Sequence, residues 1–224
     1  MLNHIKYTKT TRDYVYKHIR ELIMSLELPP GTSISEKEIA EKLQVSRTPV
    51  REAFLRLSED ELLNVLPQRG TLVTLIDLEH VDEARFLREQ AEVGMMKLAC
   101  HTFSEKSMEQ LDENIRAQKK ARNEEDEQLL FQLDHAFHRI LAEGVNKLRV
   151  WHVVQKMDTH SNRLRKLSMD LKFNWEKLVD QHEAMVEAIK KQDSVKAEKL
   201  MRAHLTLLQY DQVALKVEYP EYFN

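Results

Sequence analysis

Cysteine, glycine and proline are scarce in this chain, and each shortage excludes a class of structure. The 224 residues include one cysteine, four glycines and five prolines. The lone Cys100 excludes an internal disulfide and a thiolate metal site, and it fits a reducing compartment. Because turn-forming residues and strand-like segments are both few, the sequence favours a mostly helical protein over an all-β one.

Long apolar runs are missing as well. No run approaches the roughly 18 residues that a membrane span needs. The first residues, MLNHIKY, lack the apolar core of a signal peptide. We therefore expect a cytoplasmic protein without a membrane anchor.

A strong charge of one sign is also lacking. The formal net charge is −3, and residues 1–76 hold 11 Lys and Arg against 10 Asp and Glu. The bulk basic character common in nucleic-acid-binding domains is therefore absent. Positive charge is concentrated locally in residues 42–56, where Glu52 is the one acidic residue among four basic ones: Lys42, Arg47, Arg51 and Arg56.

The order of elements in the first third of the chain indicates a winged helix-turn-helix. A helix over residues 11–26 ends before Pro29-Pro30-Gly31. Ser35 and Glu38 form a capping box for a second helix. After a short turn over 44–46 comes a basic helix, and strands at 63–65 and 72–75 then flank a turn. Three helices and a β-hairpin wing in this order insert one helix into the DNA major groove.

The third of these helices has the features of a recognition helix. Thr48 is the predicted N-cap, with Ser46 as an alternative, and Pro49 suits the first helical position. Arg47 and Arg51 are four residues apart and share one face. A guanidinium group can bond both acceptors of a guanine edge. The alternative is that these are ordinary solvated charges.

Beyond a boundary at residues 76–80 the sequence predicts helices only. Short connections between successive helices favour an antiparallel six-helix bundle. The predicted division is a DNA-binding domain over 1–76 and a helical domain over 79–216. The six predicted helices cover residues 79–101, 105–122, 126–143, 146–169, 173–191 and 193–216.

Four potential metal ligands interrupt the apolar stripes of three of these helices. Asp134 and His138 are four residues apart on one helix, and His182 and His204 each lie in the stripe of another. Burying such groups without partners is costly, and one divalent metal would satisfy all four. Nitrogen and oxygen ligands suit Zn, Ni, Mn or Fe. The alternative is that each histidine is a hydrogen-bonded core residue.

Two motifs make the chain resemble a known family. The segment SEKEIAEKLQVSRTPVREAFLRL, followed by PQRGTLV, is similar to the amino-terminal domain of GntR-family transcription regulators. The resemblance implies homodimers on inverted-repeat operator DNA. The residues expected to contact DNA on this basis, or from their place at the helix start and the wing tip, are Lys37, Ser46, Arg47, Thr48, Arg51, Arg69 and Gly70.

Residues 79–208 resemble the FCD ligand-binding domain of the FadR branch of these regulators. The matching pieces are EARFLRE, DHAFHRILAE, QHEAMVEAI and RAHL, and six helices place the chain nearer the short VanR-like subgroup. The resemblance implies metal binding by Asp134, His138, His182 and His204, with a small carboxylate as effector. The main candidate effector ligand is Arg85, and weaker candidates for the same cavity are Arg88, Asn146, His160 and Arg163. Arg85 is equally explained by a surface pair with Glu89.

These observations predict a transcription regulator controlled by a carboxylate at a metal site, and not an enzyme. In one alternative the metal itself is the effector, and in another the metal is structural. A metal-dependent hydrolase is a weaker alternative, because no separate nucleophile or general base accompanies the ligands.

Overall fold

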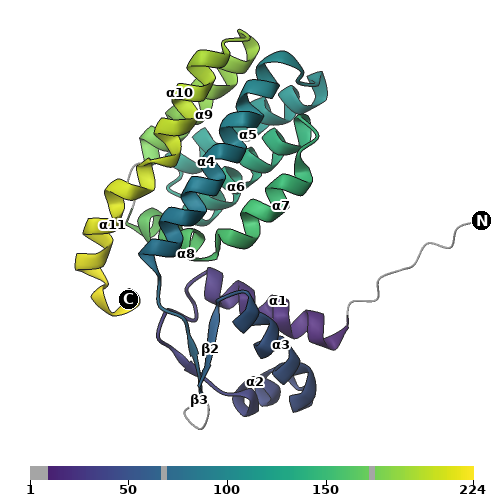
Figure 1. Ribbon diagram of the computed structural model, residues 1–224, viewed down its shortest axis with the longest axis vertical. Coiled ribbons are helices and arrows are strands. Elements are labelled where there is room, and N and C mark those ends of the chain that lie inside the picture. Colours follow the sequence, from purple (N-terminus) through teal and green to yellow (C-terminus); the bar gives the residue numbers. More distant parts are fainter. Residues whose placement is uncertain (1–9, 67–69, 172–174) are drawn as a thin grey trace, which may run out of the picture. The chain divides into compact units, whose positions relative to one another are not determined.

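The computed structural model describes residues 10–66, 70–171 and 175–224, which form two compact units (Figure 1). The first unit comprises the chain up to Ile76 together with Glu221–Asn224, and the second comprises Asp77–Pro220. The predicted mainly helical fold, with an N-terminal winged helix-turn-helix and a C-terminal helical domain, is confirmed.

The described part of the first unit contains three α-helices and a small antiparallel sheet. Its strands are arranged in the order β1-β3-β2, so β3 pairs with both neighbours. The strand β1 was not predicted from the sequence, because two residues are too few to show an alternating pattern. The elements are α1 (Thr11–Met24), β1 (Ser33–Ile34), α2 (Glu36–Leu43), α3 (Arg47–Glu59), β2 (Leu63–Leu66) and β3 (Gly70–Val73).

Local capping explains where α2 and α3 begin. The Ser35 hydroxyl accepts a hydrogen bond from the Glu38 backbone N–H at 3.1 Å, as the capping box predicted. Helix α2 ends at Gln44, which adopts the left-handed conformation with φ 53°. The N-cap of α3 is Ser46. The prediction of Thr48 was wrong, because the backbone is extended at Ser46 and already helical from Arg47 onward.

The core of the first unit fixes the orientation of α3. Val50, Ala53, Phe54 and Leu57 are at most 2% exposed and pack against buried residues of α1 and the sheet. Since one face of α3 is committed to this core, the arginines on its other face stay in solvent.

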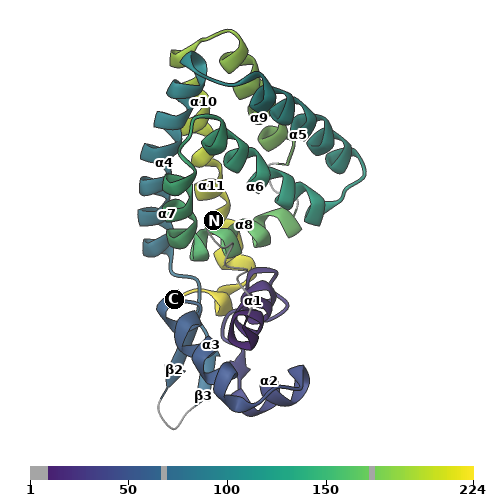
Figure 2. The same ribbon diagram turned by 90° about the vertical axis from the view of Figure 1, so that its right-hand side faces the viewer.

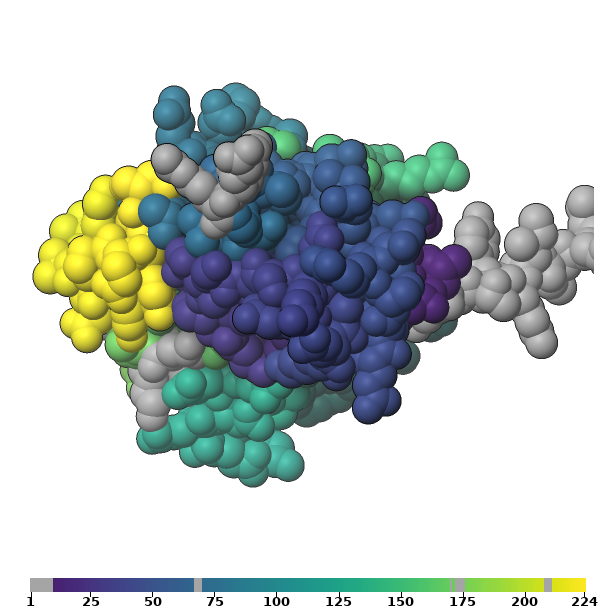
Figure 3. Space-filling view, turned by 90° about the horizontal axis from the view of Figure 1, so that it is seen from below, coloured from purple at the N-terminus to yellow at the C-terminus, as the bar shows by residue number. Residues whose placement is uncertain are grey.

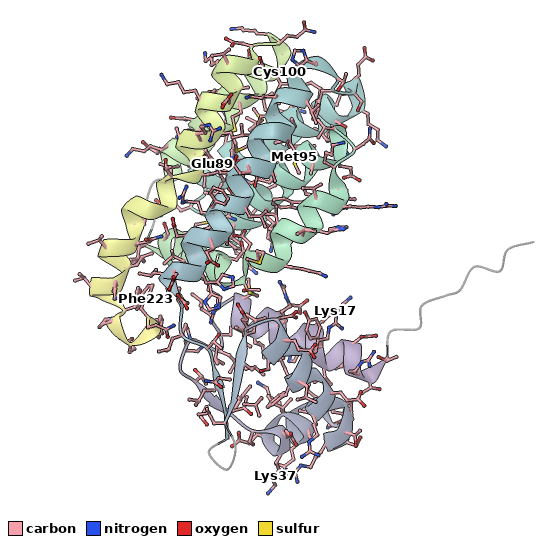
Figure 4. All side chains as sticks on the ribbon, viewed as in Figure 1. Lys17, Lys37, Glu89, Met95, Cys100 and Phe223 are labelled. Carbon is pink, nitrogen blue, oxygen red and sulfur yellow. The ribbon has the colours of Figure 1, made fainter. Side chains whose placement is uncertain are left out.

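The C-terminal tail folds with the first unit. The Ile76 N–H donates to the Tyr222 carbonyl at 2.7 Å, and the Asn224 N–H donates to the Ile76 carbonyl at 3.2 Å. Ile76 and Phe223 form a parallel β-bridge, and both side chains are buried. Phe223 is labelled in Figure 4. The chain therefore crosses twice between the two units.

The described part of the second unit has eight α-helices, two more than predicted. The predicted helices over 146–169 and 193–216 are each divided in two, at Asp158 and Thr206. The Thr206 hydroxyl donates to the Ala203 carbonyl at 2.8 Å and so competes with the helical hydrogen bonds. The Asp158 side chain is buried beside Arg88. The helices are α4 (Leu78–His101), α5 (Glu105–Asn123), α6 (Glu127–Gly144), α7 (Leu148–Met157), α8 (Thr159–Asp170), α9 (Trp175–Lys190), α10 (Ser194–Leu205) and α11 (Leu207–Glu218).

Helix α4 is the central element of this bundle. It packs against α6, α7, α8, α9 and α10, while α5 packs against α6 and α9 (Figures 1 and 2). Apolar side chains from most of these helices share one core, which includes Met96, Leu111, Phe137, Leu141 and Met185. Within the described ranges, no helix combines the length and apolarity needed to cross a membrane.

Candidate metal centre and DNA-binding surface

Four potential ligand side chains from three helices converge inside the bundle. Asp134 and His138 come from α6, His182 from α9 and His204 from α10. One ligand atom from each lies within 4.8 Å of all the others. All four residues are buried, so their positions on otherwise apolar stripes put them together in the core.

The separations between the ligand atoms suit a single metal ion. His204 Nε2 lies 3.4 Å from His182 Nε2 and 3.2 Å from His138 Nε2. Asp134 Oδ1 lies 3.8 Å from His138 Nε2 and 3.7 Å from His182 Nε2. Two ligands about 2.1 Å from a tetrahedral metal are themselves about 3.4 Å apart. The donors therefore require little movement to share one ion.

Each histidine is oriented by a partner on its other ring nitrogen. The Nδ1 atoms of His138, His182 and His204 face Glu92, Gln118 and Gln181, respectively. A carboxylate can only accept, and the two glutamines present their carbonyl oxygens, so each Nδ1 is the protonated nitrogen. Each Nε2 atom is then unprotonated and directs its lone pair at the centre of the cluster. Three convergent lone pairs repel one another unless a cation lies between them.

A chain of hydrogen bonds fixes the orientation of Gln118. Its amide nitrogen donates to the Asn114 side-chain carbonyl, and the Asn114 amide donates to the Leu133 backbone carbonyl at 3.0 Å. Because the Gln118 nitrogen is used in this way, its oxygen faces His182 at 2.8 Å. Such outer contacts hold a ligand in the tautomer that a metal requires.

The electrostatics keep the imidazoles neutral and Glu92 ionised. Burial lowers the pKa of all three histidines, so that they remain neutral and ready to bind a metal. Burial alone would raise the pKa of Glu92, but Arg88 and His138 outweigh it and lower that pKa from 4.5 to about 2. Neither carboxylate oxygen of Asp134 has a hydrogen-bond partner, although Asp134 forms an ion pair with Arg165. The donor set therefore fits a divalent cation.

A cavity opens beside this cluster. Its volume, counted as the space open to the centre of a water molecule, is about 70 Å³. Asp134 and His204 form part of its wall, so a molecule in the cavity can reach the metal position. The remaining lining residues are Val81, Arg85, Arg88, Asp158, Ser161, Arg165, Ser168, Met169, Leu178, Leu205, Leu207, Asp211 and Gln212.

Three arginines and three aspartates line this cavity. Arg88 is buried and pairs with Glu92 and, at 3.6 Å, with Asp158. Burial opposes the charge of Arg88, but these two carboxylates raise its pKa. Arg165 pairs with Asp134, and Arg85 lies at the less buried side of the cavity. A guanidinium group can grip a carboxylate through two parallel hydrogen bonds.

The cavity contains some of the predicted effector ligands but not all of them. Arg85 lines it and also pairs with Glu89 at 3.1 Å, so the predicted pair is present and the role of Arg85 as an effector ligand stays a prediction. Asn146 does not line it and is exposed at a left-handed position with φ 55° between α6 and α7. His160 does not line it either, because its Nδ1 accepts from the Asp77 N–H at 3.0 Å and its ring stacks on His80.

Sequence reasoning missed Arg165, Asp158 and the histidine partner Glu92. Glu92 interrupts the apolar stripe of α4 in the same way as the histidines interrupt theirs, so the same signal was present. Arg165 and Asp158 had no such signal, because Arg165 lies in a mostly polar helix and Asp158 lies in the break before that helix. The weaker candidate Arg88 does line the cavity, whereas Arg163 does not.

The predicted DNA-contacting residues that the structure describes lie on the surface of the first unit. Lys37, Ser46, Arg47, Thr48, Arg51 and Gly70 are all exposed. Lys37 extends outward from α2 in Figure 4, and violet-to-blue atoms of this unit form the centre of Figure 3. Gly70 has a φ of +94°, a conformation that few other residues adopt. Arg69, also predicted, lies outside the described residues.

The side chain of Arg51 is only weakly bound within this unit. Its side chain is 72% exposed and lies 3.4 Å from Glu36. A surface pair of this kind contributes little to stability. The guanidinium group is therefore available for another partner.

Comparison with known proteins identifies both units. Family models described as "Bacterial regulatory proteins, gntR family" and "FCD domain" match residues 11–73 and 83–207. The chain is 30% identical over 217 residues to the HTH-type transcriptional repressor RspR of Escherichia coli, covering 97% of this chain and 95% of RspR. It is 32% identical over 215 residues to an HTH-type transcriptional regulator of Streptomyces ambofaciens, covering 96% and 90%.

Solved structures share the fold. Escherichia coli McbR/YncC superimposes with a TM-score of 0.76 at 19% identity, covering 94% of this chain and 99% of that one. A GntR regulator from Rhodococcus sp. RHA1 gives 0.76 at 22% identity, covering 93% and 98%. The chain therefore belongs to the GntR family of bacterial regulatory proteins and is a DNA-binding transcription regulator with an FCD domain, not an enzyme.

Proposed function

We propose that a small carboxylate, bound at a metal ion in the second unit, controls the operator affinity of this regulator. The observation that carries the proposal is the position of the four-ligand cluster in the wall of an arginine-lined cavity. A metal such as Zn, Ni, Mn or Fe would be held by Asp134, His138, His182 and His204. When bound, it would accept a carboxylate oxygen at a coordination position beyond the four protein ligands, and Arg85, Arg88 and Arg165 would neutralise the rest of the charge.

In this proposal α3 reads the operator. Arg47 and Arg51 would approach base edges, while Lys37, Ser46 and Thr48 would position the unit on phosphates. The wing residues Arg69 and Gly70 would approach the minor groove. The exposure of the described members of this set supports the assignment.

The regulator would act in the cytoplasm as a homodimer on an inverted repeat, since two-fold protein symmetry matches a palindromic operator. Exposed apolar side chains on two helices that pack together, α4 and α7, support a dimer surface there. Phe86 is 64% exposed, Val153 54% and Val150 42%. Exposed apolar residues gathered on neighbouring elements often mark an interface.

The effector can change operator affinity only through different affinities for two states of the protein. Reciprocity then requires operator DNA to change the effector affinity by the same factor. We would select an operator fragment from a random DNA library and titrate the zinc-loaded protein with small acids, with and without that fragment. An effector affinity that is identical in the two titrations would contradict the proposed control.

Two alternatives use the same metal centre. In the first, the metal itself is the effector, and metal alone would switch operator binding. In the second, the metal only stabilises the bundle. His138→Ala, with the exposed His152→Ala as its matched control, separates the structural alternative from the proposed function. A structural metal predicts a lower melting temperature for His138→Ala with unchanged response of operator binding to acids, whereas the proposed function predicts that this response disappears.

A further inference from the structure

Three buried carboxylates, Asp134, Asp158 and Asp211, line a cavity that is proposed to bind an acid. Asp158 lies in the break between α7 and α8, is 1% exposed, and lines the cavity beside Arg88 and Arg165. A negative side chain repels a bound carboxylate. Attraction of an anion therefore does not explain why Asp158 lies in this cavity.

The Asp158 Oδ2 atom lacks a hydrogen-bond partner. Arg88 Nη1 lies 3.6 Å away and Arg165 Nη1 3.9 Å away, which is charge contact without a hydrogen bond. Burial raises the pKa of Asp158, whereas Arg88 and the neighbouring Ser161 lower it. A buried acceptor that stays unpaired is costly, and it is satisfied when a ligand brings a donor.

A second polar group lies one helical turn away. Ser161 also lines the cavity, is 4% exposed, and its hydroxyl lies close enough to the Asp158 carboxylate to lower its pKa, but the two groups do not form a well-aligned hydrogen bond. Residues three apart on a helix share a face. The cavity therefore presents an acceptor from Asp158 and a hydroxyl from Ser161 side by side.

We propose that Asp158 selects a hydroxy acid, meaning an effector with a hydroxyl group close to its carboxylate. The inference rests on the proposed function and names the class of effector. The effector carboxylate would bind the metal and the arginines, and its hydroxyl would donate to Asp158 Oδ2 and accept from Ser161. An acid without that hydroxyl leaves the buried Asp158 oxygen unpaired.

The surroundings favour a hydroxyl over an ammonium group. Two guanidinium groups lie within 4 Å of Asp158 Oδ2, and Arg85 lines the same cavity. A cationic ammonium at this position would be repelled by these arginines. A hydroxyl donates a hydrogen bond without adding positive charge.

Asp158 has a competing explanation as a counter-ion that holds the arginines in place. That role predicts that loss of Asp158 weakens all acids equally, because the arginines serve every carboxylate. A hydroxyl-selecting role predicts that only hydroxylated acids lose affinity. The two explanations therefore differ in the ratio of affinities, not in affinity itself.

The test compares acids that share a carbon skeleton. Zinc-loaded full-length protein is titrated calorimetrically with lactate, propionate and alanine, with malate, succinate and aspartate, and with gluconate and hexanoate. In at least one set the hydroxy acid should bind about tenfold to 100-fold more tightly than its hydroxyl-free counterpart, as expected for a hydrogen bond to a charged group. In Asp158→Ala the ratio should fall to about one.

Asp180→Asn is the matched control, since it removes one carboxylate from the surface of α9 outside the cavity. This variant should retain the full ratio of affinities between a hydroxy acid and its hydroxyl-free counterpart. Asp158→Asn keeps the shape of the side chain and serves as a second variant if Asp158→Ala does not fold. The ratio of the two affinities in the parent protein is measured without any variant. Equal affinities for hydroxylated and hydroxyl-free acids, the tightest binding by the amino acids, or a uniform loss in Asp158→Ala would each overturn the inference. Binding of none of these acids would overturn the proposed function as well.

Discussion

Replacement of Glu92 by glutamine tests whether the metal centre depends on the carboxylate behind His138. Glu92 is 0% exposed, accepts from the Arg88 guanidinium and faces His138 Nδ1. The variant keeps the size of the side chain and an oxygen that can accept, but it removes the charge. We expect Glu92→Gln to weaken both the metal centre and the fold.

The magnitude of each effect can be estimated. The pKa of Glu92 falls from 4.5 to about 2 in the folded protein. At 1.36 kcal/mol for each pH unit, this corresponds to about 3 kcal/mol of stability in the metal-free protein. Because the folded pKa is the lower one, this contribution is present above pH 4.5 and is lost as the pH falls toward 2. Loss of such an outer partner typically weakens metal binding about 10- to 100-fold.

The assay is zinc competition against a chromophoric chelator at neutral pH, combined with denaturant unfolding in EDTA. Glu89→Gln is the matched control, because Glu89 lies on the same helix and pairs with Arg85 and Arg202 without contacting a ligand histidine. It should bind zinc like the parent. Parental zinc affinity in Glu92→Gln would refute the argument that the carboxylate strengthens the centre through His138.

Four further outcomes are expected. Arg51→Ala should weaken operator binding by about 1–3 kcal/mol and relax the preference for one base pair, as measured by fluorescence anisotropy. If binding to all DNA sequences weakens equally, Arg51 contacts only phosphate. Phe223→Ala should destabilise the first unit by about 3 kcal/mol in chemical denaturation, because Phe223 is 5% exposed; an unchanged midpoint would show that the tail is dispensable. His182→Ala should lose its metal by elemental analysis, whereas the exposed His152→Ala should retain it. Phe86→Glu should convert dimers to monomers in light scattering, with the 79% exposed Val195 changed to Glu as a control that stays dimeric.

Local signals in the sequence determined most of the secondary structure and the ligand set. The serine cap of α2 acts within four residues, so it was visible without a fold. The four-residue cluster was visible because Asp134, His138, His182 and His204 interrupt apolar stripes, and burying a polar group without a partner is costly. The same local logic failed at Thr206 and Asp158, where single residues divide helices that the apolar pattern predicts as continuous.

Only the tertiary structure decided what surrounds those ligands. Glu92, Gln118 and Gln181 come from three helices, and each became a partner of a histidine only when the bundle packed. Asn146 and His160 were predicted at the cavity but lie away from it. The pairing of Phe223 with Ile76 joins two residues of the first unit that are separated in the sequence by the whole second unit. Sequence periodicity shows which face of a helix is buried, but the choice of partner depends on how helices distant in sequence pack together.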